Sequence, residues 1–329
     1  MKGPFTGKVM TRVFEERTWK FRGEEYLYIH TSWRFEDTGE LFTDDESDTA
    51  GFVRVTNQYR EKYGIPYTDE IVHTRHHYGI SAAKMSLIFG IGVNQYRLYE
   101  QGEVPSDSNG RMIRSIMNPD VMLDMVESLR NELSDSEYRK ISFKIKSGIL
   151  DNDRESIQRH ETDRVFISPR GLVNGSAPLS TNRLKNVLLY VLERCSDVWC
   201  AKMNKLLFYI DFLSYRETGM AITGLANRAM DYGSVPVRWD VVYSEFPEVR
   251  QELRCAGDFE GSILVSDTKP YMSLFSDLEM NVMKTICEKF GDCTSRSISQ
   301  TSHLEQVWQE NFKTHEMISS NESYALKVV

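Results

Sequence analysis

The fold of the central part of the chain is decided by residues 79–102, which read GISAAKMSLIFGIGVNQYRLYEQG. The first half predicts a short helix that begins at Ser81, because serine caps helices well and apolar residues follow at helical spacing. Residues 90–92 predict a turn, and residues 94–100 predict a second helix that Gly102 ends. Five side chains on these helices are expected to face inward: Met85, Ile88, Phe89, Tyr96 and Tyr99.

The second of these helices begins with polar side chains that suit contacts with DNA. Asn94 and Gln95 match the hydrogen-bonding edge of adenine, and Arg97 matches guanine or a phosphate. Lys84, on the preceding helix, completes the predicted DNA-binding set. Charges balance over residues 69–114, and phosphate neutralisation supplies most of the affinity for DNA, so binding is expected to be weak without dimerisation. The alternative, that the two helices are only a scaffold or a dimerisation unit, stays open.

The composition of the chain is that of a globular protein with a mildly acidic balance. Its 329 residues are enough for roughly two or three domains, and aromatic residues, at 11% of the chain, provide large areas to bury. The net charge of −8 excludes a basic field over the whole chain, so any contact with nucleic acid must come from a local patch. An acidic chain also suits a basic protein partner.

Cysteine usage and hydropathy predict a cytoplasmic protein without metal, cofactor or membrane segment. The five cysteines are odd in number and form no CxxC pair, which favours free thiols in a reducing compartment. Residues 1–12 contain no apolar segment of the kind that a signal peptide needs. The longest apolar stretches, such as residues 187–192, are too short to span a bilayer.

The N-terminal residues 1–62 are expected to form a small antiparallel β unit. Aromatic and β-branched residues between polar turns predict short strands at 9–14, 26–33 and 52–55. The acidic run at 44–48 could be a metal loop, but it lacks the glycine and final glutamate of a calcium loop at the required spacing. A solvated turn or the start of a helix is therefore the favoured interpretation.

The remaining segments are assigned from periodicity and turn composition. Residues 63–150 are expected to form a helical domain around the opening stretch, with Thr68 capping its first helix. The polar, turn-rich residues 151–179 are expected to form a linker. Residues 180–313 are expected to form a mostly α-helical C-terminal domain, followed by a tail at 314–329. The predicted fold class is therefore α+β and multidomain.

Within the C-terminal domain, apolar spacing predicts several elements. Residues 184–191 place apolar side chains at i, i+3, i+4 and i+7 and predict an amphipathic helix, and residues 203–213 predict a second one. Residues 261–265 predict a strand. Residues 278–290 predict a further helix that Gly291 stops.

The central stretch resembles the Xre/Cro-type helix-turn-helix. That family starts its second helix with serine, turns at glycine followed by valine or isoleucine, and ends its recognition helix with an aromatic residue, glutamate and glycine. The matching positions are Ser81, Gly90-Ile91, Asn94 to Leu98, Tyr99-Glu100, Gly102 and Pro105-Ser106. Ala82 stands where the family usually has a glutamine that helps to hold phosphate. The resemblance implies binding to operator DNA, and a homodimer is expected because such proteins commonly bind two half-sites.

Taken together, the β unit and the helical domain resemble the MqsA-type antitoxins. Those proteins have a small N-terminal zinc unit before the same kind of helical domain. Their zinc unit uses two CxxC pairs, whereas residues 1–180 of this chain contain no cysteine. The resemblance therefore implies the β unit without its metal, and no zinc is predicted there.

The C-terminal domain resembles the Panacea domain of SocA-like antitoxins. The residues that carry the resemblance are 202–213 (KMNKLLFYIDFL), 219–224 (GMAITG), 231–236 (DYGSVP), and Thr301-Ser302-His303 with Trp308. Ser234 stands where proline is common in the family. The resemblance implies a mostly helical domain that binds and blocks a toxin, in pairs with many unrelated toxin types. The residues then expected to bind the toxin are Tyr209, Asp211, Thr223, Tyr232, Val235 and Arg238.

Two residues of this domain have more than one interpretation. Asp211 lies on an otherwise apolar helix face, and a structural bond to the region of Gly224 or Tyr232 is favoured over direct contact with a partner. His303 is favoured as a packed or capping side chain, because no nucleophile or base pattern accompanies it. The sequence has no GxSxG, HExxH or GK[ST] motif, so no catalytic residue is predicted and an enzyme is disfavoured.

The sequence as a whole predicts a non-enzymatic antitoxin of a toxin–antitoxin system. Its C-terminal domain is expected to neutralise a cognate toxin by direct binding. Its helix-turn-helix is expected to bind operator DNA for autoregulation. The alternative is a transcription regulator of a mobile element, or a protease adaptor, that has no toxin partner.

Overall fold

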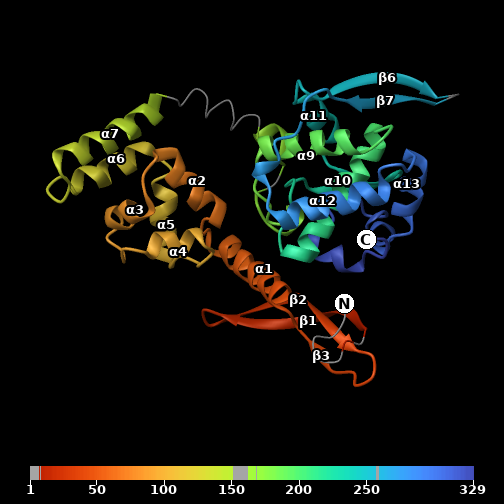
Figure 1. The fold of residues 1–329 in the computed structure, drawn as a ribbon, viewed down its shortest axis with the longest axis horizontal. Coiled ribbons are helices and arrows are strands. Elements are labelled where there is room, and N and C mark those ends of the chain that lie inside the picture. Colours follow the sequence, from red (N-terminus) through yellow and green to blue (C-terminus); the bar gives the residue numbers. More distant parts are fainter. Residues whose placement is uncertain (1–6, 8, 151–161, 168, 257–258) are drawn as a thin grey trace. The chain divides into compact units, whose positions relative to one another are not determined.

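The computed structural model describes residue 7 and residues 9–150, 162–167, 169–256 and 259–329 (Figure 1). The chain forms two compact units. One joins Met1–Val55 to Glu161–Val329 and is called the discontinuous unit; the other, Thr56–His160, is called the helical unit. The boundary between them falls inside helix α1, Asp45–Tyr63.

The discontinuous unit begins with a long β-hairpin. Strand β1, Met10–Phe21, pairs antiparallel with β2, Glu24–Phe35, and the short β3, Leu41–Phe42, joins the edge of β2. The two residues between β1 and β2 have φ of 50° and 86°, the left-handed geometry that suits the twist of a hairpin. The strands predicted at 9–14 and 26–33 are confirmed, and so is their antiparallel pairing.

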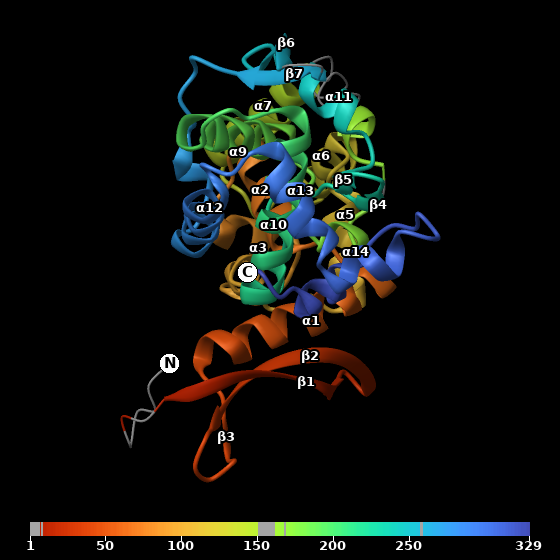
Figure 2. The same ribbon diagram turned by 90° about the vertical axis from the view of Figure 1, so that its right-hand side faces the viewer.

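The strand predicted at residues 52–55 is wrong, because these residues lie in α1. The Asp44 side chain accepts a hydrogen bond from the backbone N–H of Ser47, at 2.8 Å, just where the helix begins. Three acids in the first turn favour the positive end of the helix dipole: Asp45, Glu46 and Asp48. These local signals outweigh the strand preference of the apolar residues, and Figure 2 shows the hairpin lying along the helix.

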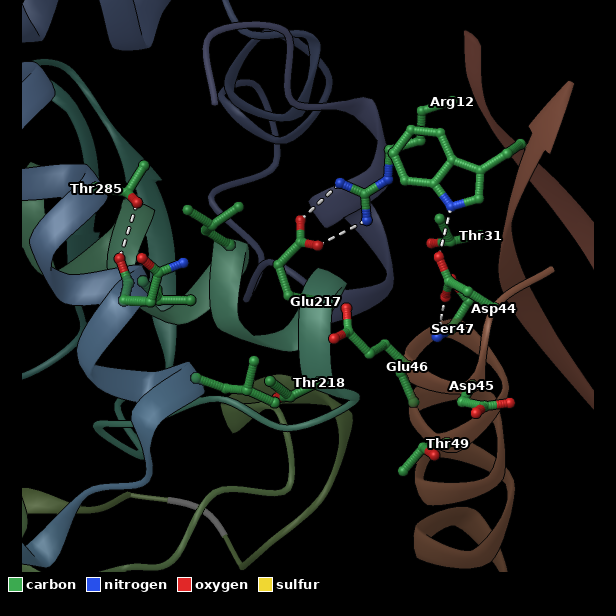
Figure 3. A pocket seen from close by; sticks show the side chains of 16 residues that line it. Arg12, Thr31, Asp44, Asp45, Glu46, Ser47, Thr49, Glu217, Thr218 and Thr285 are labelled. Atoms are coloured by element: carbon green, nitrogen blue, oxygen red, sulfur yellow. Dashed lines mark hydrogen bonds and ion pairs between the residues drawn. The ribbon is translucent and has the colours of Figure 1, made fainter. Parts of the chain in front are cut away.

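Hydrogen bonds attach the hairpin and α1 to the C-terminal part of the same unit. The Arg12 guanidinium donates two hydrogen bonds to the Glu217 carboxylate, both at 2.8 Å (Figure 3). The buried Arg54 donates to two backbone carbonyls in the last turn of α10, Cys200–Thr218, at 3.0 and 2.7 Å. The Tyr215 carbonyl also accepts from the N–H of Gly219, at 2.9 Å, so Arg54 adds a second donor there and caps the C-terminal end of the helix.

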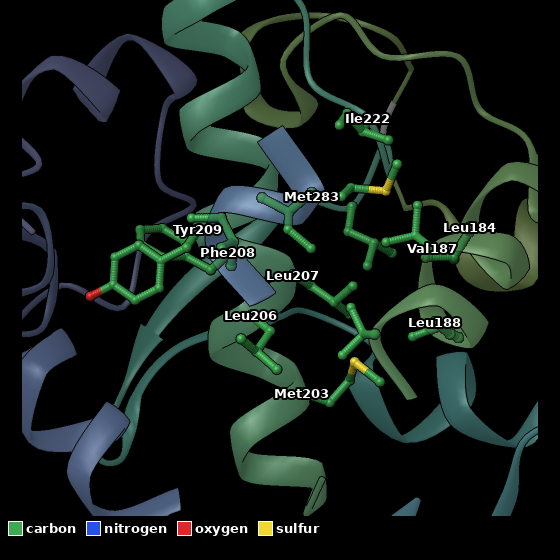
Figure 4. Close-up of a cluster of buried hydrophobic side chains, with 14 of the residues drawn as sticks. Leu184, Val187, Leu188, Met203, Leu206, Leu207, Phe208, Tyr209, Ile222 and Met283 are labelled. Atoms are coloured by element: carbon green, nitrogen blue, oxygen red, sulfur yellow. The ribbon is translucent and has the colours of Figure 1, made fainter. Parts of the chain in front are cut away.

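The C-terminal part of the discontinuous unit is built around α10, whose residues are buried from Lys202 to Arg216. It packs against α9, Thr181–Arg194, and α12, Asp277–Phe290. The apolar core between these helices includes Leu184, Val187, Leu188, Met203, Leu206, Leu207, Ile222 and Met283 (Figure 4). The helices predicted at 184–191, 203–213 and 278–290 are confirmed.

Smaller elements surround these helices. They are β4, Asn227–Met230; β5, Gly233–Pro236; α11, Trp239–Ser244; β6, Arg250–Ala256; β7, Phe259–Val265; α13, Ser295–His303; α14, Gln306–Asn311; and the short 3-10 helices η1, Leu172–Asn174, η2, Met272–Leu274, and η3, Ser320–Ala325. Strands β4 and β5 form one hairpin, and β6 and β7 form another. The strand predicted at 261–265 is confirmed as part of β7.

The helical unit continues from α1 into α2, Thr68–Tyr78; α3, Ala82–Ile88; α4, Gln95–Glu100; α5, Asp107–Ser115; α6, Pro119–Ser128; and α7, Asp135–Leu150. The Ser81 hydroxyl caps α3 by accepting a hydrogen bond from the backbone N–H of Lys84, as predicted. Helix α2 starts at Thr68, but its cap is Tyr67 and not Thr68. The five side chains expected to face inward are all buried in the core of this unit: Met85, Ile88, Phe89, Tyr96 and Tyr99.

Two segments expected to be linker and tail are packed into the discontinuous unit where the structure describes them. Of the expected linker at 151–179, residues 151–161 and 168 lie outside the described residues. Val165 and Phe166 belong to the apolar core, and the backbone carbonyl of Gly175 accepts a hydrogen bond from the N–H of Ala221, at 2.9 Å. In the expected tail at 314–329, four residues are buried: Ile318, Ser320, Ser323 and Leu326.

The α+β, multidomain fold class is confirmed, with small antiparallel sheets beside many helices. Among the described residues, no helix combines the length and the apolar character needed to cross a membrane.

Candidate functional site

The segments that carry the C-terminal sequence motifs meet around one buried lysine. Lys205, on α10, has 0% of its surface exposed, and its helix is in contact with β5 and α13. Gly233, at the start of β5, has φ of +103°, and a Cβ there would stand 2.5 Å from Lys205 Cε and 2.8 Å from the Ser302 hydroxyl oxygen. Glycine alone fits such a position without displacing its neighbours.

The Lys205 ammonium has no hydrogen-bond partner among the described residues. Burial lowers the pKa of Lys205 to about 7, so neutral and charged forms coexist near neutral pH. Three polar atoms near it likewise lack a partner within the described part of the chain: the hydroxyls of Ser234 and Ser302, and Nε2 of His303. The Tyr209 hydroxyl, one turn further along α10, faces the Glu305 carboxylate. We call Lys205, the two serines and His303 the Lys205 cluster. Most buried polar groups in proteins are paired, so the cluster departs from ordinary packing.

The rings of Tyr209 and His303 are held by aromatic neighbours. The Tyr209 ring, which lies at one side of the apolar core in Figure 4, stacks on Phe290, another core residue, with ring centres 4.9 Å apart. Burial, and then the Glu305 carboxylate, raises the pKa of Tyr209. The His303 ring stacks on Trp308 at 4.2 Å, and burial together with the nearby Lys205 lowers the pKa of His303. His303 is therefore a packed side chain in this structure.

Asp211 holds the loop that follows α10. Its Oδ1 accepts hydrogen bonds from the backbone N–H groups of Ile222 and Thr223, at 3.0 and 2.7 Å. Its Oδ2 accepts one from the Thr223 hydroxyl. Burial raises the pKa of Asp211 to about 6 even though these bonds favour the ionised form. The sequence predicted a structural bond from Asp211 to the region of Gly224, and Asp211 bonds to Ile222 and Thr223, the two residues before that glycine. These bonds fix the loop against α10.

Apolar side chains are exposed on the same segments that contribute residues to the Lys205 cluster. Tyr232, in the turn of the β4–β5 hairpin, is 76% exposed, Leu304 at the end of α13 is 70% exposed, and Met230 is 41% exposed. The Trp308 indole N–H donates to the Met230 carbonyl at 2.9 Å, and His303 bonds to the backbone of Asp231. We define the hairpin surface as Met230, Tyr232, Leu304 and Trp308. Its two segments are tied together, so its side chains are presented on a fixed base.

The structure separates the residues expected to bind a toxin into two sets. Tyr209, Asp211 and Thr223 lie in the interior, where a folded partner does not reach them. Tyr232 is exposed on the hairpin surface, Val235 is half-buried, and the exposed Arg238 donates to the carbonyl of Arg164 at 2.7 Å. The three interior residues stabilise the fold of the domain, because they pack and bond within it. The other three remain candidates for contact with a partner.

The sequence prediction did not single out Lys205 or Leu304 as site residues. Lys205 had a signal, since a lysine inside the apolar run at 202–213 must either reach water or be buried with a shifted pKa. Leu304 had none, because a single leucine after a helix reads as an ordinary core residue. Its exposure depends on how α13 packs against the hairpin.

Of the residues of the helical unit that are expected to bind DNA, some are exposed to solvent and others bond to acidic side chains of the same unit. Arg97 is exposed on α4, and Asn94 is exposed at the position just before that helix. Gln95 is half-buried, and its side-chain amide donates to Glu103 at 2.8 Å. The Lys84 ammonium donates to the Glu137 carboxylate at 2.9 Å, and that hydrogen bond is the main cause that lowers the pKa of Glu137 to about 2. Of these four residues, Asn94 and Arg97 have no side-chain hydrogen bond or ion pair to a described residue that DNA would have to replace.

Residues 203–309 match the family described as "Antitoxin SocA-like, Panacea domain". The matched region starts within α10, contains the β4–β5 hairpin and α13, and ends just after Trp308. The search of curated proteins and the search of solved structures gave no match to the chain. The resemblance stated for the C-terminal domain is confirmed in this region, whereas the resemblances stated for residues 1–62 and 63–150 stay predictions.

Proposed function

We propose that the chain is the antitoxin of a toxin–antitoxin pair and blocks its partner by direct, non-catalytic binding through the hairpin surface. The observation that carries this is the exposure of Tyr232 and Leu304 within the region that matches the antitoxin domain. Large exposed apolar side chains that gather on one face mark interaction sites, and tyrosine is frequent among the residues that dominate binding energy.

The rigid base of the hairpin surface supports this role. Because Trp308 and His303 already hold the turn at 230–232, little conformational entropy remains to be lost when a partner binds. A partner that covers a surface of roughly 1,200–2,000 Å² in total would extend well beyond these side chains. Such a contact can occlude the active or substrate site of a toxin without any chemistry by the antitoxin.

Co-expression with the product of the adjacent gene tests the proposal. Growth should fail when that product is expressed alone, recover with this chain, and fail again with Y232A/L304A, whose affinity should fall by at least about 30-fold. The matched control is L253A/Y271A, which removes a leucine and a tyrosine that are 69% and 64% exposed elsewhere on the same unit. Full rescue by Y232A/L304A at equal protein levels would refute the hairpin surface as the contact.

We further propose that the helical unit binds operator DNA through a helix-turn-helix made by α3 and α4, and so regulates its own transcription in the cytoplasm. The exposure of Asn94 and Arg97 beside the buried Tyr96 and Tyr99 favours this orientation. Gel shifts with the chain's own promoter, at about 50 and 200 mM salt, test it. Loss of the shift in R97A supports the proposal, and an unchanged shift contradicts it.

The same two experiments separate the alternative function. A regulator of a mobile element, or a protease adaptor, gives a DNA shift or a different co-purifying protein but no rescue of a toxic neighbour. A homodimer, which the two half-sites of an operator favour, is tested by the mass of the chain in light scattering with and without that DNA.

A further inference from the structure

A cavity of about 610 Å³ lies within the discontinuous unit, between segments far apart in the sequence (Figure 3). One wall comes from β2 and the first turns of α1. The other comes from the end of α10 and from α12, near Glu217 and Thr285. The cavity therefore exists only where the N-terminal hairpin and α1 meet the C-terminal helices.

Carboxylates dominate the charge of this cavity. Asp44, Asp45, Glu46 and Glu217 line it, and Arg12 is the one cation among the lining residues that the structure describes. Burial raises the pKa of Asp44, but hydrogen bonds from Ser47 and Trp33 and the charge of Arg12 more than offset this, so the net shift is downward. The pKa of Glu217 is likewise lowered on balance, because its bonds to Arg12 outweigh burial. The cavity stays negatively charged at neutral pH.

The cavity already holds one guanidinium of the chain itself. Arg12 bonds to both oxygens of Glu217 at 2.8 Å and lies over the Trp33 ring, 5.8 Å from its centre. A carboxylate fork and an aromatic face are the two partners that suit arginine best. The carboxylates of Asp45 and Glu46 beyond this pair are exposed and take no part in it.

A buried hydroxyl also lines the cavity without a partner. Thr31, on β2, is 3% exposed, and its Oγ1 makes no hydrogen bond to any described residue. A buried acceptor without a partner costs free energy, and a donor entering the cavity would remove that cost. Leu213, Leu278 and Val282 give the lining an apolar part, and uncharged polar residues such as Thr49, Thr218 and Asn281 also line it. The cavity thus combines negative charge, an unused acceptor and an apolar part of the lining.

We propose that this cavity binds a basic segment of a protein partner, in which an arginine or lysine is flanked by apolar residues. Charge complementarity selects this occupant, because the carboxylates outnumber the one cation among the described lining residues. That the partner is the toxin rests on the proposed function, whereas the basic and apolar chemistry of the segment does not. The N-terminal hairpin and α1 then contribute directly to partner recognition.

Fluorescence anisotropy with a labelled short peptide of alternating leucine and arginine tests the proposal on the full chain. The peptide should bind the wild-type chain, and the same peptide with neutral citrulline in place of arginine should bind at least about tenfold more weakly. D45N/E46Q should bind the arginine peptide about three- to tenfold more weakly, the loss expected for two partly exposed charge pairs. D124N/E132Q, which removes two exposed acids from the helical unit, is the matched control and should bind as wild type.

A second variant separates recognition from folding. T31V removes the unpartnered hydroxyl and keeps the shape of the side chain, so the thermal stability of the free chain should not fall. Its affinity for the arginine peptide should fall by at least about tenfold, the lower end of what a hydrogen bond to a charged group contributes. A merely structural threonine would give the opposite pattern, with stability lost and affinity kept.

The two proposals fail separately in these experiments. Equal binding of the arginine and citrulline peptides, or wild-type affinity in both D45N/E46Q and T31V, would overturn the cavity proposal whatever the neighbouring gene product does. Selective binding of the arginine peptide, lost in D45N/E46Q, would support the cavity even if the co-expression experiment showed no neutralisation, in which case the proposed antitoxin role alone would be refuted.

Discussion

Replacing Lys205 with methionine should stabilise the discontinuous unit, and the gain should depend on pH. The Lys205 side chain is fully buried, and burial alone accounts for the fall of its pKa from 10.5 to about 7. Methionine has a similar shape without the amine. K205M therefore removes the cost of placing an ionisable group where water does not reach it.

The sign and size of the effect follow from the two pKa values. In the unfolded chain Lys205 holds its proton up to about pH 10.5, and in the folded chain only up to about pH 7. Between these values the unfolded state binds more protons, so the stability of the wild-type chain rises with pH. From about pH 7 to about pH 9, this amounts to about 2 kcal/mol. The stability gap between K205M and wild type should shrink by that amount over the same range.

Urea unfolding followed by tryptophan fluorescence measures the difference in stability between K205M and wild type, and it reports on the discontinuous unit. All five tryptophans lie in the discontinuous unit: Trp19, Trp33, Trp199, Trp239 and Trp308. Taking the difference between variant and wild type cancels other groups that titrate in this range, such as the buried Lys202. K284M, which replaces an exposed lysine on α12, is the control and should give a small gap that does not vary with pH. A constant gap for K205M would refute the reasoning.

Three further outcomes are expected. D211N should lower the urea midpoint, with a loss of about 2–3 kcal/mol, because an amide cannot accept all three hydrogen bonds that hold Ile222 and Thr223. G219A should cost at least about 2 kcal/mol, because φ is +80° and a Cβ would stand 2.6 Å from the Ala50 carbonyl oxygen, whereas G90A, with φ of +63° and open space around it, should cost only about 1 kcal/mol. In gel shifts, K84A should weaken DNA binding less than R97A, since Lys84 is paired with Glu137; an equal loss would show that this pair opens on DNA.

The sequence predicted correctly those helices whose apolar spacing and capping residues lie within or next to the helix itself. The buried faces of α3 and α4 follow from apolar spacing, which fixes the side of a helix that turns inward. The same holds for α9, α10 and α12. The start of α3 was predicted because a serine cap acts on the backbone three residues ahead.

Burial that depends on contacts between distant parts of the chain could not be predicted from local sequence patterns. Residues 52–55 are a different case, because the cap and first-turn acids that start their helix lie only a few residues before them and outweigh their strand-forming side chains. Residues 162–179 and 314–329 have the composition of loops, but their burial depends on contacts with residues far along the sequence, such as the one between Gly175 and Ala221. Composition reports the polarity of a segment and not the surface against which it folds.

The candidate site shows the same division between scaffold and surface. Lys205, Asp211 and Gly233, which lie within the matched antitoxin region, are in the interior or packed directly against it, and they fix the loop and the hairpin in place. The side chains that a partner can touch are different ones: Tyr232 and Leu304 on the hairpin surface, and Asp45 and Glu46 at the cavity. A motif built from interior residues identifies a scaffold, and it leaves the choice of partner to surface residues that can change without disturbing the fold. Substitutions at the surface should therefore alter which partner is bound, whereas substitutions at the interior motif should alter whether the domain folds.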